Sequence, residues 1–270
     1  SLFSKLKCAY KPFKDLFGVR DIDLNIYIRE YISDFIRYAK FFGNFICDTV
    51  SLVHKEISED DNYVVIEGAQ ATGLDIDYGT YPDVTSSSCI SAGLAAAAGV
   101  GPKKIDSVYG IMKAYTSRVG AGPFPTELLD DTGEKIRELG HEYGTSTGRP
   151  RRCGWLDLVW LKYAVELNGV TDLCINHMDT IGKLDTIMVC IAYEYKGRVI
   201  SYVPDDLENC KPIYKAFEGN WGNITSIGDG KSSEEAKRAK EYLDFIERYL
   251  GVTALYLGWG PDQDNVEIRI

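Results

Sequence analysis

Apolar side chains recur at helical spacing in three stretches of the chain. Residues 155–167 carry apolar side chains on most faces of a helix and therefore predict a buried helix. Residues 232–250 predict a helix that is capped by Ser232 or Ser233 and ends at Gly251. Residues 24–42 predict a helix because their apolar positions repeat every three or four residues; these positions are Ile28, Ile32, Phe35, Ile36 and Ala39.

Between these helices the pattern predicts strands. Residues 64–68 and 173–179 indicate short strands, and residues 253–261 a strand that runs into a Gly-Pro turn. Residues 187–203 predict a hairpin with its turn at Lys196-Gly197. Strands that alternate with helices favour an α/β fold, with a mainly parallel central sheet, flanking helices and a small antiparallel hairpin.

The Gly-, Ser- and Thr-rich stretch from 68 to 126 follows a predicted strand. In parallel sheets, ligands bind beyond the carboxyl ends of the strands. We therefore expect this stretch to form loops that wrap a ligand.

Composition narrows the class of protein. The 270 residues carry a formal charge of -10, which disfavours nucleic-acid binding. The longest weakly apolar stretch, 90–101, is too short to span a membrane. Seven scattered cysteines, none at C-x-x-C spacing, argue against zinc and a disulfide framework, and for a reducing, cytoplasmic setting. The first residues lack a signal peptide and an initiator Met, so we expect a processed or truncated chain.

The clearest chemical signal is a basic turn at 145–157, in an acidic chain. Guanidinium groups bind carboxylate or phosphate oxygens two at a time, hydroxyls add donors, and glycine admits close backbone approach. The residues that predict an anion site are Thr145, Ser146, Thr147, Gly148, Arg149, Arg151 and Arg152. A solvated basic loop with Arg152 paired to Asp157 is the equal alternative.

Three other positions suit a purine nucleotide. Gln70 follows a predicted strand and can contact a base or ribose, unless it is only a polar loop residue. Asp179 can accept two N–H bonds from guanine, although on its own a helix cap or turn is the favoured interpretation. The Gly-Trp-Gly turn at 258–260 lets backbone amides contact a flat ring, and alone it indicates only a turn. His177 is the only histidine inside a candidate site.

Three long segments, 67–87, 113–128 and 143–159, closely resemble adenylosuccinate synthetase in sequence, order and spacing. The resemblance covers roughly residues 62–270 and extends to the N-terminal helices. It implies the P-loop-NTPase-like fold of that family. It also implies that 1–270 is the C-terminal portion of one domain, with a helical segment at 1–60 and a nucleotide- and aspartate-binding core at 61–270.

The resemblance implies a ligase that forms C–N bonds in AMP biosynthesis. It would join IMP and L-aspartate into adenylosuccinate while GTP becomes GDP and phosphate, with Mg²⁺, as a cytoplasmic homodimer. The implied IMP contacts are Gln70, Thr85, Val119 and Arg149. The implied aspartate contacts are Thr145, Ser146, Thr147, Gly148, Arg149 and Arg151. The implied GTP contacts are Arg151, His177, Met178, Asp179, Gly258, Trp259 and Gly260.

The chain departs from the family pattern. His177 stands where the family usually has Lys, Gly258 where it usually has Ser, and Pro150 where it usually has a basic residue. The first two changes leave ATP open as the phosphoryl donor. The family's Gly-rich phosphate loop, its catalytic Asp and His, and its Mg²⁺ contacts have no counterpart in this sequence. We therefore expect no catalytic residue and no metal ligand in this chain, and no activity from it alone.

Two alternatives stay open. The first is a phage-type relative that makes 2-aminoadenylosuccinate from dGMP, which the substituted guanine-pocket residues motivate. The second is a non-catalytic nucleotide-binding or partner-binding module, a pseudoenzyme, which the missing phosphate loop motivates.

Overall fold

The computed structural model describes residues 5, 8, 24–145, 148–222, 224–228 and 233–269. The chain divides into two compact units, residues 1–64 and 65–270. The assignment of both units to one domain stays a prediction. Among the described residues, no helix is long and apolar enough to cross a membrane.

The described part of the first unit is helical. It contains α2 (Leu24–Phe42), the 3₁₀ turn η1 (Gly43–Phe45) and α3 (Thr49–Ile57). The prediction of a helix at 24–42 is confirmed. Asp48 caps α3 by accepting a hydrogen bond from the Ser51 backbone N–H. Several large apolar side chains of this unit are exposed, among them Phe41, Phe45 and Ile46.

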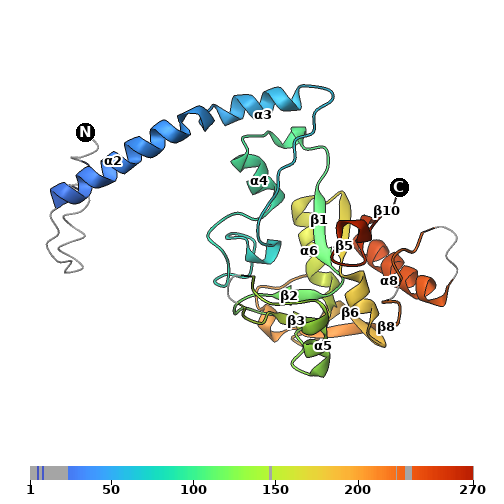
Figure 1. The fold of residues 1–270 in the computed structure, drawn as a ribbon. Coiled ribbons are helices and arrows are strands. Elements are labelled where there is room, and N and C mark those ends of the chain that lie inside the picture. The colour runs from blue at the N-terminus through green and yellow to red at the C-terminus, as the bar shows by residue number, and fades with distance from the viewer. Residues whose placement is uncertain are drawn as a thin grey trace. The chain divides into compact units, whose positions relative to one another are not determined.

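The second unit is built on a sheet with strand order β1-β5-β9-β10 (Figure 1). Its strands are β1 (Tyr109–Lys113), β5 (Asp172–Asn176), β9 (Thr253–Gly258) and β10 (Val266–Ile268). β1 and β9 both pair with β5 in parallel, and β10 pairs with β9 antiparallel. The prediction of a mainly parallel central sheet is confirmed, and β1, β5 and β9 end on the same side of the unit.

A second sheet joins β4 (Leu156–Asp157), β6 (Thr186–Tyr195), β7 (Arg198–Ile200) and β8 (Lys211–Glu218). β6 and β7 form the predicted hairpin, because Lys196 and Gly197 both take positive φ angles, 49° and 72°. β8, which the sequence pattern did not predict, extends the hairpin on β6. A third, two-stranded sheet pairs β2 (Thr116–Arg118) with β3 (Arg152–Gly154).

The predicted strand at 64–68 is wrong. These residues are not in a strand, and no described strand pairs with them. The side chain of Val65 is 86% exposed. An apolar run becomes a strand only where a neighbour accepts its backbone hydrogen bonds, and within the described part of the chain no segment does so.

Helices α6 (Leu158–Asn168) and α8 (Glu234–Leu250) supply much of the core and pack against each other. α6 begins three residues later than the predicted start at 155. Asp157 ends β4 and caps α6 by accepting from the backbone N–H groups of Val159 and Trp160. α8 follows its prediction, with Ser233 as the cap and left-handed Gly251 after its end.

The remaining elements are shorter and connect these layers. The helices are α4 (Ser91–Ala97), α5 (Asp131–Leu139) and α7 (Met178–Gly182). The 3₁₀ turns are η2 (Thr72–Leu74), η3 (Pro102–Lys104), η4 (Leu207–Asn209) and η5 (Gln263–Asn265).

The loop that contains η2 is organised around a buried carboxylate. Asp75 has no exposed surface, and it accepts hydrogen bonds from the backbone of Asp77, Tyr78 and Cys89 and from the Ser88 hydroxyl. Burial by itself would raise the pKa of Asp75, but these four donors lower it to about 2. The ionised carboxylate therefore holds the loop in shape.

We expect the stability of this loop to fall in acid. Because the folded-state pKa of Asp75 lies below its unfolded-state value, its contribution is complete above about pH 4 and is lost as the pH falls toward 2. The contribution is about 2 kcal/mol. Urea unfolding at pH 7 and pH 3 measures it. Asp75→Asn should lower stability at pH 7 and flatten the acid loss, and an unchanged slope in this variant would contradict the assignment.

Candidate functional site

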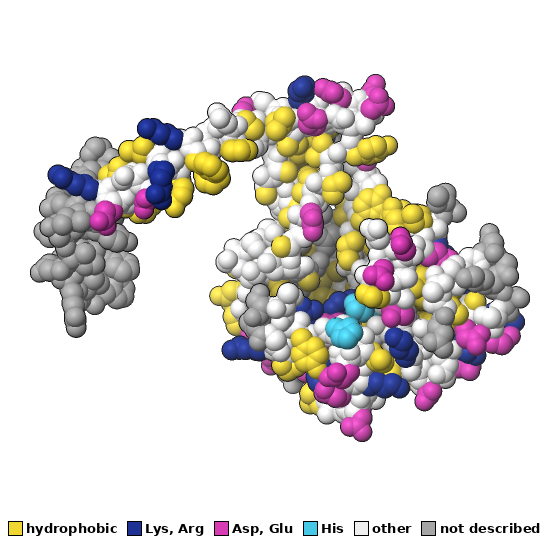
Figure 2. Space-filling model, in the orientation of Figure 1, with side chains coloured by type: hydrophobic (Ala, Val, Ile, Leu, Met, Phe, Trp, Pro, Cys, Tyr) yellow, Lys and Arg dark blue, Asp and Glu magenta, His cyan; other side chains and the backbone are white. Residues whose placement is uncertain are grey.

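The second unit contains a cavity of about 450 Å³. Its walls come from the loop at 70–80, from the end of β1 through residue 125, from Arg151, and from the start of α6. Figure 2 shows Lys or Arg side chains and His side chains gathered beside a hollow in this unit. The cavity lies where the parallel strand β1 ends, as expected for a ligand site in an α/β fold.

Three cationic side chains line the cavity of this acidic chain: Lys113, Arg118 and Arg151. The guanidinium of Arg118 is engaged within the protein, because it donates to the Thr80 hydroxyl and to the carbonyls of Ala121 and Asp83. Arg118 thus joins the loop at 70–80 to the loop after β2. Lys113 and Arg151 are the cations better placed to meet a ligand.

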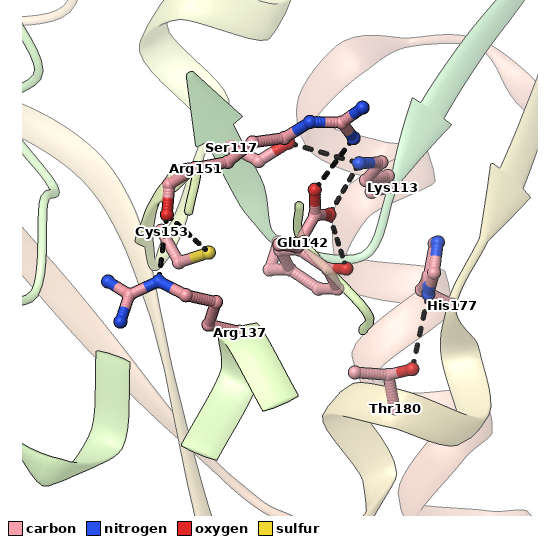
Figure 3. A network of polar contacts seen from close by, with 9 residues as sticks. Lys113, Ser117, Arg137, Glu142, Arg151, Cys153, His177 and Thr180 are labelled. Carbon is pink, nitrogen blue, oxygen red and sulfur yellow. Dashed lines mark hydrogen bonds and ion pairs between the residues drawn. The ribbon is translucent and has the colours of Figure 1, made fainter. Parts of the chain in front are cut away.

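Lys113 and Arg151 share one buried carboxylate, Glu142 (Figure 3). Its oxygens lie 2.5 Å from Lys113 Nζ, 2.6 Å from the Tyr115 hydroxyl and 2.9 Å from Arg151 Nη1. Burial favours the neutral acid, but Lys113, Tyr115 and Arg151 lower the pKa of Glu142 below its usual value. Two cations against one carboxylate leave this wall of the cavity positive, which suits an anion.

His177 lies beside this cluster at the end of β5. Its ring stands edge-on to Tyr115, with 5.4 Å between the centroids, and its Nδ1 lies 3.2 Å from the Thr180 hydroxyl. Burial and then the charge of Lys113 lower the pKa of His177, so the ring is neutral at pH 7. His177 and Gln70 both have a φ of 64°, a left-handed conformation uncommon outside glycine and often found at binding sites.

The residues predicted to contact IMP fall into two groups. Gln70 and Val119 line the cavity and come from two separate segments of the chain. Thr85 and Arg149 are not part of its described lining: Thr85 is half-buried and donates its backbone N–H to Leu74, and Arg149 is exposed.

Of the predicted aspartate residues, Thr145, Gly148 and Arg149 lie on a loop whose base is paired. Tyr143 and Pro150 form an antiparallel bridge, and the Gly144 backbone N–H donates to Arg149 at 2.8 Å. Thr145 and Gly148 are exposed near the tip of this loop. Ser146 and Thr147 lie outside the described residues.

The alternative prediction, a solvated basic loop, paired Arg152 with Asp157, and this pairing is wrong. Arg152 pairs with Glu127, with Nη2 2.5 Å from the carboxylate. Asp157 instead accepts from the Tyr193 hydroxyl at 2.6 Å. Arg151, the neighbour, is the arginine that reaches the cavity.

The two predicted guanine segments come together at the ends of neighbouring strands. A Cβ on Gly258, the last residue of β9, would lie 2.6 Å from the side-chain oxygen of Asn176, the last residue of β5. A larger residue at 258 would therefore require the Asn176 side chain to shift. Gly260 follows, with a Cβ position 2.6 Å from the Asn265 side-chain oxygen.

Not every side chain in these segments can reach a ligand. Met178 has no exposed surface and Trp259 only 4%, so contacts there are limited to the backbone. Asp179 is the second residue of α7 rather than its cap, a position that His177 takes, and its carboxylate lies 3.6 Å from Lys183. None of these residues is in the described lining of the 450 Å³ cavity.

Sequence reasoning did not select Lys113, Glu142 or Arg118. Lys113 and Arg118 lie within a recognised segment, and Glu142 immediately precedes another, but no local pattern marks them. The described residues contain no group of three or more His, Cys, Asp or Glu side chains that could hold a metal ion.

Comparison with known proteins identifies the family. The family model for adenylosuccinate synthetase matches residues 2–267. The adenylosuccinate synthetase of Acetivibrio thermocellus is 48% identical over 240 residues, which are 87% of this chain and 56% of that protein. The enzyme of Clostridium botulinum strain Hall is 46% identical over 98% of this chain and 61% of that protein. The chain thus spans about three fifths of the length of these relatives.

A solved structure supports the same assignment. The fully ligated adenylosuccinate synthetase from Plasmodium falciparum aligns with a TM-score of 0.87 and 33% identity, over 100% of this chain and 63% of that one. The expected P-loop-NTPase-like fold is therefore confirmed for the portion present here. On its sequence and its fold, this chain belongs to the adenylosuccinate synthetase family.

Proposed function

We propose that this chain forms the part of an adenylosuccinate synthetase that binds IMP, L-aspartate and GTP. One observation carries the proposal: Gln70, Val119 and Arg151, from three separate stretches of the chain, line a single cavity. Gln70 and Val119 would contact IMP there, and Arg151 would bind the aspartate carboxylate and the GTP phosphates.

The chemistry needs such an arrangement. The O6 oxygen of IMP is a poor leaving group, so GTP first phosphorylates it to give 6-phosphoryl-IMP and GDP. The aspartate amine then attacks C6, and phosphate leaves with the oxygen. The protein must hold three anionic reactants close together and offset their charge. Lys113 and Arg151 supply the positive charge at one wall of the cavity.

The guanine base would bind at the ends of β5 and β9. There the Asp179 carboxylate would accept two N–H bonds from guanine, and the backbone at 258–260 would contact the ring. The neutral His177 ring can stack on a base where the family usually has a lysine stem. A carboxylate at 179 favours GTP over ATP, because adenine presents an acceptor to it where guanine presents a donor.

The described residues do not fit a Mg²⁺ site, because they contain no group of three or more His, Cys, Asp or Glu side chains that could hold the ion. All seven cysteines are free thiols, which supports a reducing, cytoplasmic location. A homodimer is proposed on family membership.

Product formation by the complete gene product tests the proposal. We expect adenylosuccinate from IMP, L-aspartate, Mg²⁺ and GTP, much less with ATP, and little product when dGMP replaces IMP. Efficient turnover of dGMP would favour the phage-type alternative. Absence of product with either donor would remove the proposal, and nucleotide binding without turnover would support a non-catalytic module.

A further inference from the structure

Arg151 is held at three points (Figure 3). Its backbone N–H donates to the Glu142 carbonyl at 2.8 Å, and its own carbonyl accepts from Arg137 Nε at 2.9 Å. Its Nη1 donates to the Glu142 carboxylate at 2.9 Å. Glu142 therefore fixes both the main chain and the side chain of Arg151.

Glu142 itself is hidden from ligands. Its side chain has no exposed surface, whereas the side chain of Arg151 is 31% exposed. The other carboxylate oxygen accepts from Lys113 and from Tyr115. Because three donors from separate segments converge on it, the carboxylate has little freedom to move.

The guanidinium of Arg151 is left partly unsatisfied. Its Nε is buried and has no hydrogen-bond partner among the described residues. A buried donor without a partner is unfavourable, and a ligand oxygen in the cavity would relieve that cost. Glu142 thus holds the guanidinium of Arg151 in one orientation, while its Nε remains a donor that a ligand oxygen could accept from.

Glu142 also sits at the base of the loop that is proposed to bind aspartate. The loop at 143–150 leaves the body of the unit after Glu142 and returns at Arg151, and the Tyr143–Pro150 bridge closes its base. The position of the Arg151 guanidinium is therefore set by Glu142 at the base of the loop.

We propose that Glu142 is a positioning residue, which holds Arg151 in the orientation that meets aspartate and GTP and ties it to Lys113 at the end of β1. This inference rests on the proposed function. Without the negative charge, Lys113 and Arg151 would repel each other and the guanidinium would turn away from the ligand.

The test is Glu142→Gln in the complete gene product. We expect the KM values for L-aspartate and GTP to rise about 10- to 100-fold, because a small misplacement of a binding group has effects of this order. The KM for IMP should stay within about twofold, since IMP is assigned to other residues. General loss of folded protein would lower kcat and leave all three KM values unchanged.

Glu247→Gln is the matched control. Glu247 is also a largely buried carboxylate, which pairs with Arg269 at 2.5 Å and accepts from the Ala254 backbone, and it does not line the cavity. We expect no change in any KM. Glu142→Asp, which keeps the charge, should recover part of the lost affinity.

Two further variants keep the test decisive. Tyr115→Phe removes one donor to Glu142 but keeps the ring, and should raise the KM for L-aspartate a few-fold even if Glu142→Gln folds poorly. When Glu142→Gln is added to Arg151→Ala, the KM for L-aspartate should change by less than about twofold, because Glu142 acts through Arg151.

If Glu142→Gln matches Glu247→Gln, or raises all three KM values equally, the positioning role is wrong while the proposed function stands. If the wild-type protein forms no adenylosuccinate, the proposed function fails, and this inference fails with it.

Discussion

Arg151→Ala should raise the KM for L-aspartate by about 100-fold, which corresponds to about 2.7 kcal/mol of binding free energy. The guanidinium offers paired, charged donors to a carboxylate, and such charge-assisted hydrogen bonds are strong. Its loss also leaves Glu142 and Lys113 as a neutral pair, so the cavity wall loses its excess positive charge. The KM for GTP should rise as well.

Initial rates at varied L-aspartate and GTP measure this effect. Arg149→Ala is the informative comparison, because Arg149 is assigned to IMP as well as to L-aspartate, so its loss should also raise the KM for IMP. Unchanged kinetics in both variants would show that the arginines of the loop are structural.

Asp157→Ala should lower the free energy of unfolding by about 3 kcal/mol. The carboxylate caps α6 through two backbone N–H groups, a contribution of about 1 kcal/mol. It also accepts from the Tyr193 hydroxyl, which is fully buried and would be left without a partner, at a cost of about 2 kcal/mol. Because Asp157 and Trp160 both line the cavity, loss of the cap should also loosen the site.

Denaturant unfolding, followed by circular dichroism, measures the loss. Asp157→Asn is the control, because the amide oxygen can still cap the helix while the amide NH₂ group faces the Tyr193 hydroxyl oxygen, which can accept from it. It should be less than half as destabilising as alanine. Equal losses in the two variants would mean that the amide replaces none of the hydrogen bonds of the carboxylate, and would contradict the expected rescue.

The sequence predicted elements best where local chemistry decides the backbone. Ser233 and Gly251 mark the two ends of α8, and Lys196-Gly197 marks the hairpin turn. The prediction of a strand at 64–68 failed, because no described strand pairs with this apolar run. The predicted helix start at 155 was three residues too early, because Asp157 caps the helix. In each failure the outcome depended on a hydrogen-bond partner rather than on the pattern.

The candidate site shows the same division. Long motifs pointed to Gln70, Val119 and Arg151, and the cavity brings these three together. The same motifs did not indicate Glu142, although its carboxylate forms ion pairs with both Lys113 and Arg151.

By itself, the amino-acid sequence determined the family, the two ends of α8, the hairpin turn and the acidic charge against which a cluster of arginines stands out. Only the tertiary structure decided how those charges pair. Arg152 pairs with Glu127, 25 positions away, rather than with nearby Asp157, and Lys113 pairs with Glu142, 29 positions away. Caps and turns depend on backbone angles and neighbours within a few residues, whereas ion pairs of this kind depend on how strands pack and which loops they bring together.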